Sequence, residues 1–232
     1  MKRLIFVITG LIALSLINAQ SLEEILQKYS VAHKIDQLSN LKTIKTTSKM
    51  LVMGMEMQAE TWMKNPNKIK TISNMNGQES IQVFDGEKGY IVNNMGGIRN
   101  VIEMTPEQVK EMLRQNMFEN IWMDYYKNGQ LTLEGEERVN ESPAFKIKAT
   151  LNDGFIYLFI DKGSYLPVKQ FFTINLEGNS ATVESFPSEY AEINGVFLPM
   201  KTKGLFFGVE VTITITNVEV DIPMEDSIFR LN

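Results

Sequence analysis

Residues 209–216 read VEVTITIT, and this strict alternation decides the fold class. Every second residue is Val or Ile, and the residues between them are Glu or Thr. Because successive side chains of a β-strand point to opposite faces, such a strand has one apolar face and one polar face. Residues 145–151, FKIKATL, and residues 53–64, MGMEMQAETWMK, follow the same pattern. One-faced strands of this kind are typical of an antiparallel sheet that covers something on one side only.

Turn dipeptides separate these alternating runs. Asn76-Gly77, Asp85-Gly86 and Asn194-Gly195 are three of them. Asn, Asp and Gly tolerate the positive φ that tight hairpins need. Short strands joined by such turns indicate an antiparallel meander and argue against parallel βαβ units.

Two helices are expected beside the strands. Ser21 and Glu24 form an S-x-x-E capping box, and an apolar pattern of helical period continues to about Ser39. Thr105 caps a second helix that we expect to run to about Lys127. The second half of that helix is apolar in nearly every direction, so it must be buried on more than one side. We therefore predict an α+β fold, with two helices against the concave face of one strongly curved antiparallel sheet.

The first residues have the layout of a secretory signal peptide. Lys2 and Arg3 precede an apolar run at residues 4–17, and Ala19 is a small residue before the polar Gln20. The apolar run is shorter than the roughly 20 residues that a membrane-spanning helix needs. The pattern predicts export, with cleavage after Ala19, and no later stretch of the sequence is long and apolar enough to span a membrane.

The exported part would be acidic. Removing residues 1–19 leaves 21 basic against 28 acidic residues, so the formal charge changes from −5 to −7. Without a cluster of Lys and Arg, this balance argues against a nucleic-acid surface. The chain has no cysteine, so its stability must come from a hydrophobic core. Gln20 stands where a bacterial lipoprotein has its acylated Cys, and we expect residues 20–232 to form a single soluble domain without a lipid anchor.

Residues that could carry catalysis are scarce. His33 is the one histidine, and its place on the apolar side of the first predicted helix favours a packing role. Zinc would need three or four ligands at suitable spacing, which the sequence does not supply. The motifs of serine hydrolases, P-loop proteins and dinucleotide-binding proteins are missing. A carboxylate pair formed by folding stays open, because such pairing is spatial. We expect a binding protein with no cofactor, and not an enzyme.

Methionine is unusually concentrated. Eleven of the 14 Met lie between residues 50 and 123. Met is flexible and polarisable, so it fills irregular spaces and recurs on surfaces that accept varied apolar partners. Two interpretations stay open: an ordinary core in a protein that uses Met freely, or the deformable lining of a hydrophobic cavity. For the second, strand parity and helix faces select as lining Met53, Met55, Met57, Met63, Met75, Met112, Leu113, Met117, Ile121 and Trp122.

The order of several short motifs resembles the LolA/LolB-like superfamily, which includes the periplasmic carrier of outer-membrane lipoproteins. The motifs are WMKNPNK at residues 62–68, FDG at 84–86 with Gly89-Tyr90, YLFID at 157–161 with Leu166-Pro167-Val168, Phe186 and Tyr190 with INGV at 193–196 and Pro199, and Ile222-Pro223 with Asp226-Ser227 and Phe229. The similarity extends over essentially the whole of residues 20–232.

This resemblance implies an unclosed, or half, β-barrel whose interior takes up acyl chains. It implies a periplasmic carrier of lipids or lipoproteins, with lipoprotein-sorting components of the inner and outer membranes as partners. One departure concerns the lid. The carriers have an arginine on an early strand that helps to hold the helical lid closed, whereas residues 41–64 contain four Lys and no Arg. Lysine lacks the planar fork of donors. A sensor or protein-interaction module of the envelope with the same fold therefore stays open as the alternative.

Overall fold

The computed structural model describes residues 20–231 except for residues 153, 177–178 and 207, so the predicted signal peptide at residues 1–19 lies outside the described residues. The helices are α1 (Leu22–Ala32), α2 (Ile35–Asn40), α3 (Pro106–Leu113), α4 (Ile121–Lys127) and the 3₁₀-helix η1 (Asp226–Phe229). The first strands are β1 (Thr43–Val52), β2 (Met55–Lys64), β3 (Lys68–Met75), β4 (Gln78–Phe84), β5 (Gly89–Met95) and β6 (Ile98–Glu103). The later strands are β7 (Leu131–Val139), β8 (Ser142–Leu151), β9 (Gly154–Asp161), β10 (Pro167–Leu176), β11 (Asn179–Ile193), β12 (Val196–Phe206) and β13 (Val209–Val220).

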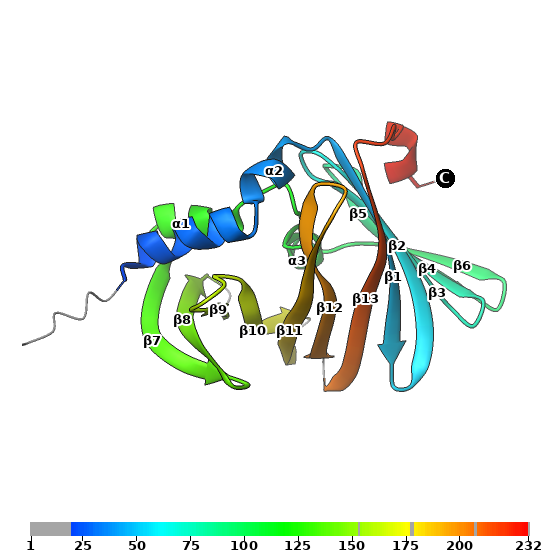
Figure 1. Cartoon of the computed structure of the whole chain (residues 1–232). Coiled ribbons are helices and arrows are strands. Elements are labelled where there is room, and N and C mark those ends of the chain that lie inside the picture. Colours follow the sequence, from blue (N-terminus) through cyan, green and yellow to red (C-terminus); the bar gives the residue numbers. More distant parts are fainter. Residues whose placement is uncertain (1–19, 153, 177–178, 207, 232) are drawn as a thin grey trace, which may run out of the picture.

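Within the described residues, the strands form one 13-stranded sheet in which every neighbouring pair is antiparallel. Strands β1 to β6 run outward from the centre to one edge, and β7 to β13 run from the other edge back to the centre, where β13 pairs with β1. The sheet is strongly curved and its two edges do not meet (Figure 1). The predicted α+β fold, an unclosed half-barrel formed by a single antiparallel sheet, is confirmed.

The hairpin turns agree with their sequence signals. Asn76 and Gly77 adopt φ values of 53° and 79°, and Asn194 and Gly195 adopt 52° and 82°. Two successive residues of positive φ are the geometry of a type I′ turn, whose twist matches that of the flanking strands. The register shifts in three of the strand pairs, β1–β13, β9–β10 and β7–β8. Such bulges increase the local twist and help the sheet to curl.

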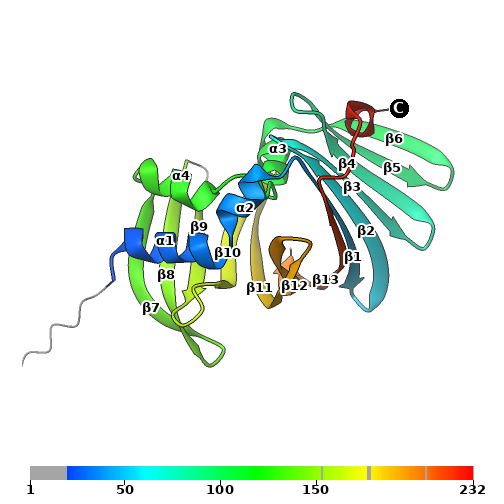
Figure 2. The ribbon, with the colours of Figure 1, turned by 45° about the horizontal axis from the view of Figure 1, so that its top comes forward.

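The helices lie where the connections require them. Strands β6 and β7 follow one another in the chain but form opposite edges of the sheet, so the chain between them crosses the sheet, and α3 and α4 lie in that crossing (Figure 2). One buried cluster joins α1 and α4 to β8 and β9 through Ile25, Leu26, Trp122, Ile147 and Leu158. A second cluster packs α2 and α3 on strands near the centre of the sheet, through Leu38, Met112, Ile44, Met63 and Ile69. Both clusters contain the inward-facing residues of the one-faced strands.

Both predicted helices are interrupted. The helix expected from Ser21 to about Ser39 is two helices, because Lys34 adopts a left-handed φ of 54° between α1 and α2. The helix expected from Thr105 to Lys127 ends at Leu113 and begins again at Ile121. The two capping boxes, at Ser21 and Thr105, are present as predicted.

An asparagine explains the second interruption. The side chain of Asn116 donates from Nδ2 to the carbonyl of Pro66 at 2.8 Å and accepts from the backbone N–H of Phe118 at 3.1 Å. Asn side chains compete in this way with the hydrogen bonds of a helix. Asn120 then caps α4 by accepting from the N–H of Met123. Residues 114–120 are called the α3–α4 linker below.

The last residues of the chain pack on the sheet beside β2 to β5. Phe229 is buried together with Met224 and Val83, and Trp62 packs against this cluster. Asp226 of η1 accepts hydrogen bonds from the ammonium groups of Lys64 at 2.6 Å and Lys68 at 2.8 Å. These two bonds lower the pKa of Asp226 to about 2.

The ion pairs of Asp226 predict a pH dependence. The pKa of Asp226 is about 2 in the folded protein and about 3.9 in an unfolded chain, so its stabilising effect is complete above about pH 5 and is lost as the pH falls towards 2. In urea titrations, the wild type should be more stable than Asp226→Asn at pH 6, and the difference should shrink below pH 4. A difference that is the same at pH 6 and pH 2.5 would contradict this assignment.

Gly204 predicts a steric constraint on the sheet. It lies in β12 opposite Ser185 of β11, where an added Cβ would stand 2.3 Å from the carbonyl oxygen of Glu184. Gly204→Ala should therefore lower the free energy of unfolding by about 1–3 kcal/mol, measured in urea, because a backbone atom has to move. Gly163→Ala is the matched control, because its nearest atom is a side-chain oxygen of Asp161 at 3.4 Å. Equal effects of the two substitutions would refute the steric explanation.

Candidate functional site

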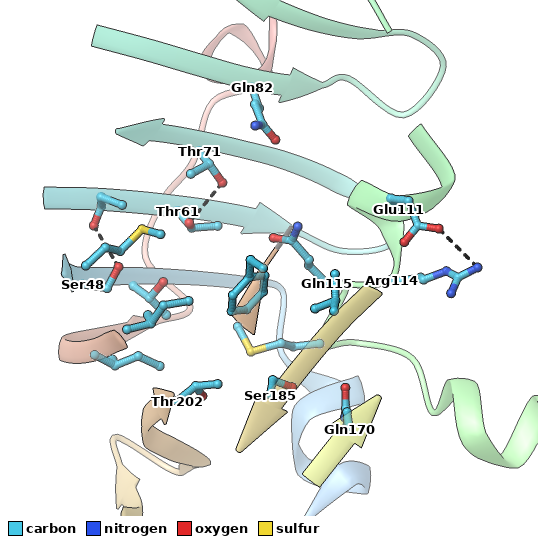
Figure 3. Close-up of a pocket in the computed structure, with 18 of the residues that line it drawn as sticks. Ser48, Thr61, Thr71, Gln82, Glu111, Arg114, Gln115, Gln170, Ser185 and Thr202 are labelled. Carbon is cyan, nitrogen blue, oxygen red and sulfur yellow. Dashed lines mark hydrogen bonds and ion pairs between the residues drawn. The ribbon is translucent and has the colours of Figure 1, made fainter. Parts of the chain in front are cut away.

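The inside of the curved sheet holds a cavity of about 680 Å³, called the main cavity. This volume falls within the range of about 300–1,000 Å³ that is usual for ligand sites. Strands β1 to β4 form one wall, β9 to β13 form the other, and residues of α3, the α3–α4 linker and α4 lie against it (Figure 3). The large apolar side chains of the lining are Met50, Met57, Met63, Met117, Ile121, Trp122, Ile156, Phe172, Val183, Phe206, Ile213 and Ile215.

The α3–α4 linker separates the main cavity from a second one of about 360 Å³, which reaches α1 and α2. Arg114, Gln115 and Met117 of the linker line both cavities, as do Ile121 and Trp122 of α4. The linker therefore contacts both cavities, while Gln115 and Glu119 within it are also exposed at the surface.

Side-chain hydrogen bonds attach the α3–α4 linker to other elements. Asn116 donates to the carbonyl of Pro66, between β2 and β3, at 2.8 Å. Asn120 donates to the hydroxyl of Ser30 in α1 at 3.0 Å. Such bonds are worth about 0.5–1.5 kcal/mol each. Phe118 of the linker is also buried in the cluster beneath α3, so packing holds the linker as well.

The charges in the main cavity cancel. Glu111 and Arg114 are the charged side chains of its lining, and they form an ion pair at 3.3 Å. Both side chains are partly buried, and their ion pair leaves no net charge in the cavity. The described lining thus combines apolar side chains with uncharged polar ones.

Five of the ten side chains that the sequence selected line the main cavity: Met57, Met63, Met117, Ile121 and Trp122. The other five lie elsewhere. Met53 is in the β1–β2 turn with 74% of its surface exposed, so strand parity does not apply to it, and Met55 beside it is 43% exposed. Met75 ends β3 outside the described lining. Met112 and Leu113 pack in the cluster beneath α3.

Sequence reasoning did not select the polar residues of the lining. They are Thr46, Ser48, Thr61, Thr71, Ser73, Gln82, Gln115, Gln170, Ser185 and Thr202. Thr61 shares the predicted apolar face of residues 53–64, and the pattern Thr46, Ser48, Met50 in β1 has the same period of two. The signal that could have found them is this run of small hydroxyl residues at inward positions.

Within the described residues, no group of three or more His, Cys, Asp or Glu side chains could hold a metal ion. No helix in the same part of the chain has the length and hydropathy to cross a membrane.

No protein-family model matches the sequence, and no curated protein matches it. Solved structures do match. A LolA superfamily protein from Nitrosomonas europaea aligns with a TM-score of 0.57 at 14% identity, covering 92% of this chain and 99% of the other. The chain has a LolA-like fold.

Two other structures support the LolA-like fold. A DUF1329 family protein from Desulfovibrio piger aligns with a TM-score of 0.60 at 12% identity, over 89% of this chain and 97% of the other. A domain described as an outer membrane lipoprotein-sorting protein, from Vibrio parahaemolyticus, aligns with a TM-score of 0.58 at 10% identity, over 89% and 94%. At these identities the likeness concerns the fold, so the lining of the cavity has to be read from this chain itself.

His33 lines the second cavity of the LolA-like fold. Its ring lies 5.7 Å from that of Tyr29 and 6.0 Å, edge-on, from that of Tyr190. The buried Nδ1 of His33 makes no hydrogen bond within the described residues. Burial lowers the pKa of His33, because a charged imidazolium is poorly solvated there. The ring is therefore neutral at pH 7, in agreement with the packing role that the sequence predicted.

This environment predicts a loss of stability in mild acid. The pKa of His33 is lower in the folded than in the unfolded protein, so the unfolded state binds the proton first as the pH falls below about 6.5. The contribution of His33 to the free energy of unfolding should be constant above pH 7 and should fall as the pH drops below about 6.5, whereas His33→Gln should lack this step. Because the chain has one histidine, urea titrations of the two proteins isolate its contribution. Parallel pH profiles would show that His33 titrates normally.

Proposed function

We propose that this protein is a periplasmic carrier that binds the acyl chains of lipids or lipoproteins in its main cavity and moves them toward the outer membrane. The observation that carries the proposal is a cavity of about 680 Å³, with apolar side chains on both walls, inside a LolA-like fold. The name of one neighbour, an outer membrane lipoprotein-sorting protein, is in line with it. The predicted signal peptide at residues 1–19 would deliver the protein to the periplasm.

The physical basis of binding is burial of alkyl chain. Transfer of each CH₂ group from water to an apolar lining stabilises the complex by about 0.8 kcal/mol. Met50, Met57, Met63 and Met117 contribute flexible side chains to the lining, which can adapt to chains of different shape. Such a site favours alkyl chains in general and does not require one particular ligand.

Exposed apolar side chains indicate where a ligand would enter. Leu51, Met53 and Met55 surround the β1–β2 turn, and 43% or more of the surface of each is exposed. They follow Met50 and precede Met57, which line the main cavity. Met53 and Met55 would then guide a chain from a membrane or a sorting component into the cavity, although they do not line it.

The two tryptophans allow a direct test. Trp122 lines the main cavity, whereas Trp62 packs against the C-terminal segment and is not among the lining residues. The variant Trp62→Phe keeps Trp122 as its one reporter. Adding a fatty acid brominated along its chain should quench the Trp122 fluorescence strongly and saturably, because bromine quenches only at close contact.

The matched control is Trp122→Phe, which keeps Trp62 as the reporter. Its fluorescence should change little over the same titration. Equal quenching in both variants would indicate non-specific adsorption, and no quenching in either would remove the acyl-chain proposal. Native mass spectrometry of protein purified from a bacterial periplasm would then identify a bound lipid directly.

A transfer assay separates the carrier from the sensor. Protein loaded with a fluorescent lipopeptide should deliver it to acceptor vesicles faster than spontaneous exchange does. Saturable binding without such delivery would favour an envelope sensor or interaction module, an alternative that the missing arginine at residues 41–64 also favours.

A further inference from the structure

One wall of the main cavity carries a row of polar side chains across four strands. Thr46 of β1 lies directly opposite Thr61 of β2, Thr61 opposite Thr71 of β3, and Thr71 opposite Gln82 of β4. All four line the cavity, and three of them are labelled in Figure 3. Directly opposite residues have Cβ atoms about 5 Å apart, so the row is continuous. We call it, together with Ser48 and Ser73, which lie on either side of Ala59 in the next row, the hydroxyl band.

The hydroxyl band lies between two apolar rows. On one side, Ile44, Met63 and Ile69 are paired in the same register and are buried in the cluster beneath α3. On the other side, Met50 is paired with Met57, and both line the cavity. If this wall bound alkyl chain alone, the positions between these two rows would be expected to be apolar as well. Val replaces Thr with the same shape and fits a strand equally well, so neither packing nor strand propensity requires the hydroxyl groups.

The hydrogen bonds within the band leave capacity for a ligand. Thr61 and Thr71 share one bond of 3.1 Å between their hydroxyl oxygens. The hydroxyl of Ser48 donates to the carbonyl of Ala59 at 3.5 Å, and that of Ser73 to the carbonyl of Ser80 at 3.4 Å. A hydroxyl offers one donor and two acceptor sites, so each can accept at least one further bond. Covering these groups with alkyl chain alone would cost the hydrogen bonds that water makes to them.

The opposite wall is mixed. Phe172, Val183, Ile213 and Ile215 bring apolar side chains into the same cavity from β10, β11 and β13, and they alternate with the polar side chains of Gln170, Ser185 and Thr202. The charges of Glu111 and Arg114 cancel in their ion pair at 3.3 Å. A ligand that complements both walls has an alkyl part and, beside it, an uncharged group that can donate and accept hydrogen bonds.

We infer that the ligand of this protein is an uncharged amphiphile, of the acylglycerol type, whose glyceryl ester is bound inside the cavity by the hydroxyl band. Its acyl chain lies against the apolar side chains of the opposite wall, Phe172, Val183, Ile213 and Ile215. This inference rests on the proposed acyl-chain function and specifies the ligand class for the same cavity. The glyceryl group of a diacylglyceryl lipopeptide has the same chemistry as that of a free acylglycerol.

The test compares three ligands that have the same 12-carbon chain: 1-monolauroylglycerol, dodecanoate and 1-chlorododecane. Their affinities are measured by displacement of the fluorescent probe N-phenyl-1-naphthylamine. The wild type should bind the monoacylglycerol most tightly. In the double variant Thr61→Val and Thr71→Val, its affinity should fall about tenfold, while that of 1-chlorododecane stays within about twofold.

Two features keep the comparison clear. The double variant removes both partners of the Thr61–Thr71 bond and keeps their shape, so it should fold with near wild-type stability, which thermal unfolding checks. Thr202→Val is the matched control, because Thr202 lines the same cavity from β12, outside the band. Its affinity for the monoacylglycerol should stay within about twofold of the wild-type value.

Each other outcome decides against the inference. Equal affinity of the wild type for all three ligands, or a loss that Thr202→Val reproduces, overturns the hydroxyl band as a polar subsite and leaves acyl-chain binding standing. Tightest binding of dodecanoate overturns the uncharged class. A wild type that binds none of the three overturns the proposed function, and this inference with it. A diacylglyceryl lipopeptide in the same assay distinguishes lipoprotein from free lipid as the source of the glyceryl group.

Discussion

The pairing of β1 with β13 is the interaction on which the rest of the structure depends. It joins strands that are more than 150 residues apart in the sequence, and it turns two meanders into one sheet. Once these strands pair at the centre, β6 and β7 become the outer edges, although they are neighbours in the chain. The chain between them must then cross the curved sheet. The helices and the linker of that crossing form one side of the main cavity because of this topology.

The crossing also explains why residues 118–126, in the second half of the chain segment between β6 and β7, are mostly apolar. Trp122 is buried in the cluster that α4 forms with α1, β8 and β9, and it lines both cavities as well. A helix in this position has the sheet on one side, another helix on a second and the cavities on a third. Apolar residues in several directions are therefore required, which is what the sequence of residues 118–126 indicated, and Asp124 marks the exposed side of the helix. The same residues that stabilise the fold thus belong to the candidate site.

The alternation of inward-facing and outward-facing residues along each strand made the fold predictable from the sequence. The same alternation did not predict which inward-facing residues line the cavity. The alternation in residues 209–216 depends only on local geometry, and so do the type I′ turn at Asn76-Gly77 and the capping box at Ser21. Whether an inward-facing side chain lines the cavity depends on how far α3 covers that face of the sheet. No local sequence pattern contains this information. Met112 is therefore in the core, whereas Met57 is in the cavity. Shortly after the end of α3 at Leu113, Asn116 bonds to Pro66, which lies 50 residues earlier in the chain and which no local pattern could indicate.

Cross-strand register, which a single sequence does not give, decides the chemistry of the wall. Thr46, Thr61 and Thr71 are unremarkable one by one, because Thr is common in strands. They become a continuous row only because the turns at either end of β2 fix its register against β1 and β3. Alkyl burial alone stabilises every greasy ligand in proportion to its length, so it selects poorly and releases slowly. A polar row inside the cavity changes this balance. It penalises ligands that leave its hydroxyl groups without partners, and it lowers the barrier to release, because water can take the place of the ligand at the band.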